Sequence, residues 1–136
     1  MKILIICSKT FYSQIPAIKK QLEEKGIEIV LPNCYDNPET EQQMWRKGEK
    51  EHSEFKARMY KQSEETIAGV DAVLVLNFNK REYPNYIGGA TFLEMYDAFR
   101  LGKKIYLYNN IPHGMLFDEI QGFSPIVING DLNKIC

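Results

Sequence analysis

Short runs of mostly apolar residues alternate along the chain with longer segments whose apolar residues recur at helical spacing. The apolar runs, which we expect to form strands, lie at residues 2–7, 27–31, 71–76, 104–108 and 126–128. Runs that are apolar almost throughout are typical of parallel strands that are covered on both faces. Strands that alternate with helices therefore predict a three-layer α/β fold with a parallel sheet and right-handed crossovers.

The segments between these runs predict the helices. Ser13 can cap a helix that ends near Gly26, and shorter helices are expected at about 91–101 and 116–120. A long, strongly charged helical insertion at about 38–68 is interrupted by Gly48. We expect it to form two helices or one bent helix, mostly solvated, which serves as an oligomer contact or as a cover for a pocket.

The start of the charged insertion is predicted from three kinds of residue. Asn37 suits the N-cap, Pro38 suits the first helical position, and acidic residues follow in the first turn. Acidic side chains there stabilise the helix, because they face the positive end of its dipole. These features predict that the helix begins directly after Asn37.

Length, charge and cysteine content narrow the class of protein. The 136 residues suit a single domain, 1–136, and a formal net charge of -1 gives no electrostatic basis for binding a nucleic-acid polymer or an anionic membrane. The first apolar run is too short for a signal peptide, and no stretch approaches the roughly 20 apolar residues of a membrane helix. Three widely separated cysteines form no Cys-x-x-Cys pair. We therefore expect a cytoplasmic protein without disulfides.

No metal or cofactor is expected from the motifs. Neither His52 nor His113 has a companion at metal-ligand spacing, and the turn after the first strand lacks the glycines of a Walker loop or a dinucleotide fingerprint. His113 would lie at the ligand-binding edge of the sheet, either as a substrate contact or as a turn residue.

Ligands of open parallel sheets bind outside the carboxyl ends of the strands. That rule selects three polar segments, at residues 8–13, 77–91 and 109–114. The long loop at 77–87 carries two basic residues and two tyrosines, which suit a lid over a phosphorylated ligand or an ordinary loop anchored by its tyrosines.

The segment 88–94, with the sequence GGATFLE, is the strongest candidate for chemistry. Two glycines before a helix let backbone N–H groups face an anion, and Glu94 could then present its carboxylate to the same ligand. The alternative is structural, because Thr91-x-x-Glu94 is also a capping box in which Glu94 only bonds back to the cap. The motif by itself leaves both interpretations open.

The turn after the first strand, residues 7–13, is the second candidate. Its hydroxyls and its lysine can bind phosphate, and Phe11 or Tyr12 can stack on a base. Cys7 is either a nucleophile or, as most free cysteines are, a small buried core residue.

Together these segments resemble the nucleoside 2-deoxyribosyltransferase superfamily. The matching stretches lie at residues 5–11, 26–32, 71–77 and 88–94, the last continuing to residue 105. The segment 88–94 is also similar, with one residue fewer, to the Gly-Gly-x-Gly-Thr-x-x-Glu signature of cytokinin-activating phosphoribohydrolases. Both families cleave N-glycosidic bonds.

The resemblance implies a five-stranded parallel sheet of flavodoxin-like or Rossmann-like topology, in the strand order 2-1-3-4-5, and a homo-oligomer. It also implies that Glu94 is the nucleophile, that the loop before it binds the sugar's 5′ end, and that the turn after the first strand binds the base of a small-molecule nucleoside or nucleotide. The substrate-binding residues expected on this basis are Ser8, Lys9, Thr10, Phe11, Asn77, Asn85, Gly88, Gly89 and Thr91.

The chain departs from the family pattern at one position. Family members carry an aspartate in the helix before the third strand, where this chain has residues 62–66, QSEET. Glu64 either replaces that catalytic acid or the acid is missing. Three functions follow: N-glycosidic bond cleavage or deoxyribosyl transfer, a non-catalytic nucleotide-binding module, or a flavodoxin-like flavin-binding protein suggested by the hydroxyls of Ser8, Thr10 and Ser13.

Overall fold

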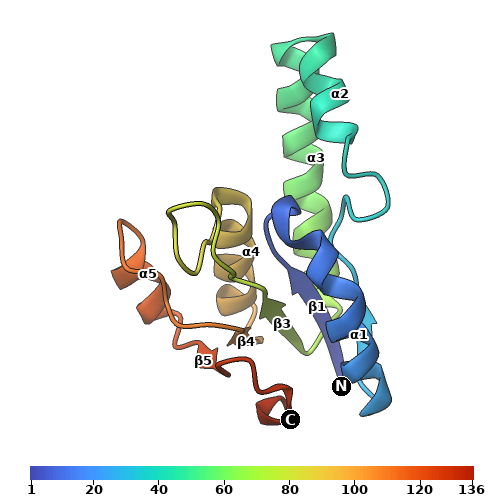
Figure 1. Ribbon diagram of the computed structural model, residues 1–136. Coiled ribbons are helices and arrows are strands. Elements are labelled where there is room, and N and C mark those ends of the chain that lie inside the picture. Colours follow the sequence, from blue (N-terminus) through green and yellow to red (C-terminus); the bar gives the residue numbers. More distant parts are fainter.

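The five predicted strands form one parallel sheet. The structure, a computed structural model, describes all 136 residues (Figure 1). The strands are β1 (Lys2–Ile6), β2 (Glu28–Val30), β3 (Ala72–Val75), β4 (Lys104–Leu107) and β5 (Ile126–Val127). Neighbouring strands pair in the order β2-β1-β3-β4-β5, all parallel. The predicted α/β class and strand order are confirmed.

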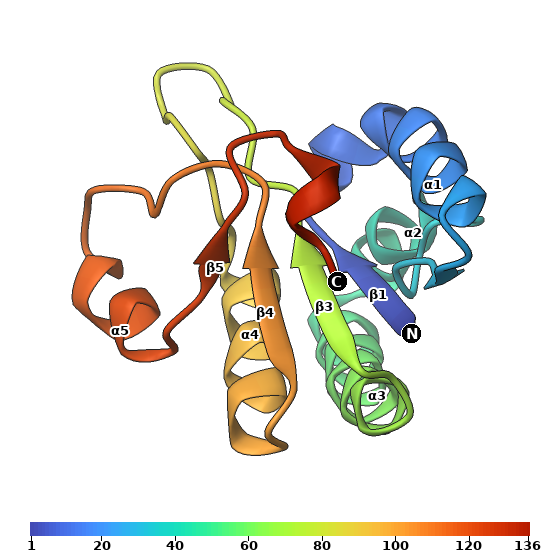
Figure 2. The ribbon, with the colours of Figure 1, turned by 90° about the horizontal axis from the view of Figure 1, so that it is seen from below.

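Helices cover both faces of this sheet (Figure 2). They are α1 (Ile15–Glu24), α2 (Thr40–Lys47), α3 (Glu49–Ala68), α4 (Gly89–Arg100) and α5 (Phe117–Gly122), with 3₁₀ helices η1 (Lys9–Gln14) and η2 (Leu132–Lys134). One core lies beneath α1 and the C-terminal segment, and the other lies beneath α3, α4 and α5. No helix is both long and apolar enough to cross a bilayer.

Two predicted helix starts are wrong. Ser13 lies inside η1, and α1 begins at Ile15 after Gln14. The amide N–H of Phe11, whose side chain is buried, donates to the Ser8 carbonyl at 2.9 Å and starts a 3₁₀ helix that runs to Gln14 before α1 begins. At the insertion, α2 begins at Thr40 rather than after Asn37, because the Thr40 amide and hydroxyl both donate to the Asn37 carbonyl and close a separate turn first.

The charged insertion forms two helices, α2 and α3, joined at Gly48. The φ of Gly48 is 147°, a value that favours glycine and that separates the two helix axes. We call residues 40–60, which comprise α2 and the first part of α3, the arm. In Figure 1 the arm projects beyond the carboxyl edge of the sheet, whereas the end of α3 packs on the sheet through Ile67.

Candidate active site

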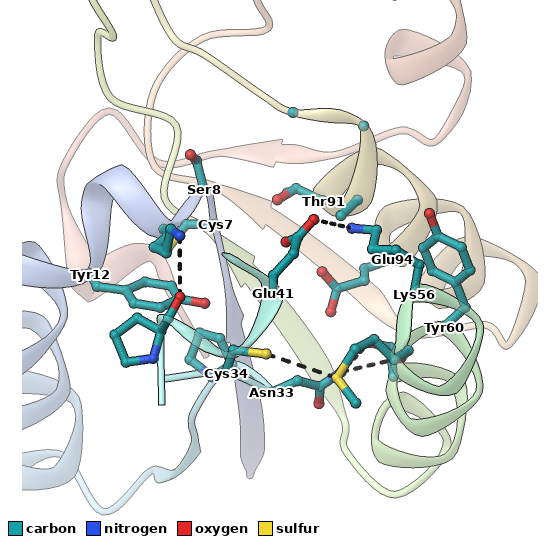
Figure 3. A pocket seen from close by; sticks show the side chains of 18 of the residues that line it. Cys7, Ser8, Tyr12, Asn33, Cys34, Glu41, Lys56, Tyr60, Thr91 and Glu94 are labelled. Atoms are coloured by element: carbon teal, nitrogen blue, oxygen red, sulfur yellow. Dashed lines mark hydrogen bonds and ion pairs between the residues drawn. The ribbon is translucent and has the colours of Figure 1, made fainter. Parts of the chain in front are cut away.

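A cavity of about 290 Å³ opens at the carboxyl edge of the sheet. The loops after β1, β2 and β3 meet there, at the place where the chain switches from one side of β1 to the other, which is the usual ligand position in such sheets. Figure 3 shows side chains converging on it from four parts of the chain. Those used below are Cys7, Ser8, Lys9, Tyr12, Asn33, Glu41, Lys56, Met59, Tyr60, Ser63, Gly88, Gly89, Thr91 and Glu94.

The start of α4 decides between the two interpretations of the segment 88–94. Gly88 is the N-cap, so Thr91 is the third residue inside the helix and is only 4% exposed. No side-chain cap bond is made at this helix start. A capping box would require Thr91 itself to be the cap. The capping-box alternative is therefore wrong, and Glu94 is free to line the cavity.

Gly88 is also closely approached by a side chain of the loop before it. A Cβ atom at this position would lie 3.3 Å from the hydroxyl oxygen of Tyr86. A side chain at this position would require the ring of Tyr86 to move by a few tenths of an ångström.

Glu94 is a mostly buried carboxyl group, and burial raises its pKa to about 7. The hydrogen bond from Ser63 lowers the pKa, the charge of Asp97 raises it, and the charge of Lys56 lowers it. Ser63 is in turn held by Asn33, whose Nδ2 donates to Ser63 Oγ at 2.7 Å and to the Met59 carbonyl at 3.2 Å. The cavity therefore holds the Glu94 carboxyl group in a place where its ionisation is unusually unfavourable. Carboxyl groups with such raised pKa values are common in active sites.

The raised pKa of Glu94 predicts how stability changes with pH. The ordinary value of 4.5 applies to the unfolded chain, so the folded chain binds more protons between pH 4.5 and about 7. The free energy of unfolding should then fall by about 3 kcal/mol as the pH rises through this window. Glu94→Gln has no such carboxyl group and should lack this decrease. Chemical denaturation of both proteins from pH 4 to 8 measures the difference, and parallel curves would contradict the assigned burial.

Glu41 and Lys56 form an ion pair on the arm side of the cavity. Lys56 Nζ lies 3.6 Å from Glu41 Oε2, and His52 Nε2 lies 2.8 Å from the same oxygen. Burial by itself would raise the pKa of Glu41, but the His52 hydrogen bond and the charges of Lys56, His52 and Lys9 lower it. Glu41 is therefore a second carboxylate of the cavity, and Lys56 acts electrostatically on both Glu41 and Glu94.

Cys7 and Tyr12, two further ionisable groups of the cavity wall, keep their protons. Burial, followed by the charge of Glu94, raises the pKa of Cys7 to about 12, and burial also raises the pKa of Tyr12. A thiol with such a pKa is not a nucleophile at neutral pH. Of the two predicted roles for Cys7, the nucleophile is therefore wrong, and the half-buried thiol instead borders the cavity.

Six of the predicted site residues lie together around the cavity: Ser8, Lys9, Gly88, Gly89, Thr91 and Glu94. Three others do not reach it. Thr10 is exposed on η1, and Phe11 is 4% exposed and packs against the ring of Phe78 at 5.6 Å. The amide N–H of Asn85 donates to Asn79 Oδ1 in the loop. These three expectations are corrected: η1 turns Tyr12, not Phe11, toward the cavity.

Asn77 is a structural residue. Its fully buried side chain donates to the carbonyls of Asn109 and Asn110 at 3.1 and 3.0 Å and accepts from the amide N–H of Asn109 at 2.8 Å. Both ends of the amide are thus used to join the loops after β3 and β4. The expectation that Asn77 contacts the ligand is corrected, because its side chain instead joins these two loops.

Glu64 lies outside the cavity. Its exposed carboxylate pairs with Arg100 Nη2 at 2.8 Å on the outer side of α3 and α4. The neighbouring Ser63 faces the cavity instead, because one helical position rotates a side chain by about 100°. Glu64 is thereby removed as the acid of this site.

The sequence did not single out six further residues of the cavity. Asn33 follows the second strand, so the rule about carboxyl ends of strands could have found it. The other five lie in the charged helices, where no signal marks them as cavity residues: Glu41, Lys56, Met59, Tyr60 and Ser63.

Comparison with known proteins agrees with the fold. The chain resembles the solved structure of the 2-deoxyribosyltransferase from the psychrotolerant bacterium Bacillus psychrosaccharolyticus, a biocatalyst for the synthesis of antiviral and antitumoral nucleosides. The TM-score is 0.59 over 90% of this chain and 81% of that chain, at 16% sequence identity. No family model and no curated protein matches the sequence. The chain therefore has a nucleoside 2-deoxyribosyltransferase-like fold.

Proposed function

We propose that this protein cleaves the N-glycosidic bond of a nucleoside or nucleotide, with Glu94 as the nucleophile. The observation that carries the proposal is the mostly buried carboxyl group of Glu94, with a pKa of about 7, inside the cavity at the switch point of the sheet. The fold of a 2-deoxyribosyltransferase is consistent with this chemistry.

The reaction suits a carboxylate that is poorly solvated. As the bond between C1′ and the base nitrogen breaks, positive charge develops on C1′ and the ring oxygen of the sugar. A carboxylate beneath C1′ stabilises that charge and can then bond to C1′, which yields a glycosyl ester. Burial makes the ionised form of Glu94 unfavourable in the empty cavity. The positive charge that develops on the sugar offsets this desolvation cost in the transition state.

The walls of the cavity suit the parts of a nucleoside. Tyr12 and Tyr60 lie on opposite sides, with Glu94 between them (Figure 3). Aromatic and thioether surfaces from Tyr12 and Met59 suit a flat base, while the loop at Gly88 and Gly89 suits the 5′ end of the sugar. A volume of about 290 Å³ lies near the lower end of small-molecule sites, as expected for a ligand of this size.

The proposal is tested with a panel of nucleosides, 2′-deoxynucleosides and their 5′-monophosphates, with and without a free acceptor base. Chromatography should detect the free base with at least one member of the panel. New nucleoside formed only with an acceptor base would assign a transferase, and base release into water would assign a hydrolase. Thermal stabilisation by nucleotides without any turnover would favour a nucleotide-binding module instead and would overturn the proposed catalysis.

We also propose that the chain forms a homo-oligomer through the outer face of α4. Tyr96 and Phe99 are 48% and 49% exposed there, and the ring of Phe123 lies 5.5 Å from that of Phe99. Leu93, 43% exposed, extends this patch. Contiguous exposed apolar surface of this kind marks interaction sites.

Light scattering should give a molar mass of two or more chains, each of 15.8 kDa. Phe99→Glu should lower the mass to that of one chain, because it places a charge in the buried interface. Gln21→Glu, the same new charge on the exposed face of α1, is the matched control and should not change the mass. A wild-type monomer at every concentration contradicts the proposed oligomer.

A further inference from the structure

The side chains around the cavity include no acid that could protonate a departing base, apart from Glu94 itself. Phenol, thiol and ammonium groups keep their protons at neutral pH unless their surroundings lower the pKa. Burial has the opposite effect here, because it raises the pKa of Cys7 to about 12 and also raises the pKa of Tyr12 and of Cys34. None of these groups can therefore give up a proton to a leaving base.

The carboxyl groups near the cavity do not supply that acid either. Burial by itself would raise the pKa of Glu41, but the His52 hydrogen bond and the neighbouring positive charges lower it, so this group is ionised. Glu94 must be ionised to attack C1′ and cannot give a proton in the same step. Glu64 pairs with Arg100 outside the cavity. The cavity thus provides a nucleophile without a second acid.

The charges next to Glu94 favour a positively charged ligand. Glu41 already has partners, because its Oε2 lies 3.6 Å from Lys56 Nζ and 2.8 Å from His52 Nε2. At Glu94, burial raises the pKa, and the charge of Asp97 raises it more than the charge of Lys56 lowers it. The ionised Glu94 is therefore poorly solvated and lies in a locally negative field, which a cation beside it would offset.

Aromatic rings at two walls of the cavity suit a flat cation. Tyr12 and Tyr60 lie on opposite sides of Glu94 (Figure 3), and the face of an aromatic ring attracts cations. Lys56 Nζ already lies 5.6 Å from the centre of the Tyr60 ring. The ring of Tyr12 borders the same cavity without such a partner. A planar, positively charged base would be attracted both by this ring and by the Glu94 carboxylate.

We propose that the substrate is a nucleoside or nucleotide whose base is a positively charged aromatic ring, such as a pyridinium, joined to C1′ through its charged nitrogen. The inference rests on the proposed glycosidic cleavage and names the substrate class of that reaction. Such a base departs as a neutral molecule, so the reaction needs only the nucleophile that the cavity provides.

The step balances without a proton donor. A carboxylate oxygen of Glu94 bonds to C1′, the bond from C1′ to the ring nitrogen breaks, and its electron pair stays on that nitrogen, which cancels the positive charge. In the second half, water attacks C1′, the ester bond breaks, its electron pair returns to Glu94, and a proton of the water passes to solvent. Hydrolysis of this substrate therefore releases a proton, whereas an uncharged nucleoside releases none, because the departing base takes that proton up.

The first test compares a cationic substrate with an uncharged one of nearly the same shape. Nicotinamide riboside and its 5′-monophosphate carry a pyridinium base, and their 1,4-dihydro forms differ by one hydride and carry no charge on the base. Wild-type protein should release base from the pyridinium forms at least about 10²-fold faster than from the dihydro forms. 7-Methylguanosine and guanosine, with their 2′-deoxy counterparts, extend the comparison to a cationic purine and to both sugars.

The pH dependence checks that Glu94 is the only group that must titrate. The kcat/KM for nicotinamide riboside should rise as the pH increases through about 7, because only ionised Glu94 attacks C1′, and it should then stay level in mildly alkaline solution. An acid that protonates the base would instead add a falling limb at higher pH. A pH indicator in weak buffer should show one proton released for each nicotinamide.

A binding measurement tests the substrate class without turnover. 1-Methylnicotinamide is a pyridinium cation with no glycosidic bond, and nicotinamide is its uncharged counterpart. At pH 8, where Glu94 is ionised, ligand-observed NMR should show that wild type binds the cation at least about fivefold more tightly. Glu94→Gln should lose this preference, whereas Glu24→Gln, the same change on the exposed side of α1, should keep it.

The outcomes separate the substrate class from the proposed function. Dihydro and unmethylated substrates that react as fast as their cationic counterparts would overturn the cationic substrate and leave glycosidic cleavage in place. A falling alkaline limb with nicotinamide riboside, or equal binding of nicotinamide and 1-methylnicotinamide by wild type, would do the same. Wild-type protein that releases no base from any cationic or uncharged substrate would overturn the proposed function and the substrate class with it.

Discussion

Replacing Glu94 with glutamine is expected to lower kcat/KM for base release about 10³-fold or more, which corresponds to about 4 kcal/mol of lost transition-state stabilisation. The amide is nearly the same size as the carboxyl group, so the cavity keeps its shape. It carries no negative charge to oppose the developing cation, and it cannot form the glycosyl ester. The loss should appear with every member of the substrate panel that wild type cleaves.

The matched control is Glu24→Gln, which makes the same change on the exposed side of α1 and should retain wild-type rates. Because burial raises the pKa of Glu94 to about 7, the Gln variant should be at least as stable as wild type at pH 8. A variant that is folded, stable and still active would show that the nucleophile lies elsewhere. A variant that is inactive because it unfolds at pH 8 would contradict the assigned burial.

Asn77→Ala is expected to lower the free energy of unfolding by about 2–4 kcal/mol. The wild-type side chain satisfies two carbonyl groups and one amide N–H in the loops after β3 and β4, and Asn77 itself is fully buried. Alanine leaves all three backbone groups without that partner, and water can reach them only if the loops separate.

Urea denaturation at constant pH measures this change. Asn110→Ala provides the control, because Asn110 is exposed and contributes only its backbone carbonyl to the clamp. The control should lie within about 0.5 kcal/mol of wild type. If the two variants were equally stable, the hydrogen bonds of Asn77 would not hold the loops, and a direct role in ligand binding would again be open.

The sheet could be predicted from the sequence because its signal is local. Residues 72–76 are apolar without interruption, and the structure buries every residue of β3. Helix starts were less predictable, since Ser13 and Asn37 are good capping residues in isolation. In the structure α1 begins one residue later than a cap at Ser13 predicts, and α2 begins two residues later than a cap at Asn37 predicts.

The site was predictable only where it adjoins the strands. Six predicted residues from the first-strand turn and the start of α4 meet at the cavity. The role of Glu94 depended on whether α4 begins at Gly89 or later, a choice that the sequence GGAT permits in both ways. Only the three-dimensional start of the helix separates a capping carboxylate from one that lines the cavity.

The arm side of the cavity could not be predicted for a different reason. Glu64 is the acid nearest to the expected position in sequence, but rotation about α3 turns it toward Arg100. Glu41 reaches the cavity because α2 folds back along α3, a tertiary contact set by the break at Gly48. Neither fact is encoded in local spacing.

The most direct measurement is intact-protein mass spectrometry after incubation with a 2′-fluoro-2′-deoxynucleoside, whose fluorine slows the breakdown of a glycosyl ester by destabilising positive charge at C1′. The account predicts a mass increase equal to one fluorinated sugar residue, located by proteolysis in the peptide that contains Glu94 and absent from Glu94→Gln. Base release by wild type with the sugar bound to another residue, or with an unchanged adduct in Glu94→Gln, would contradict Glu94 as the nucleophile.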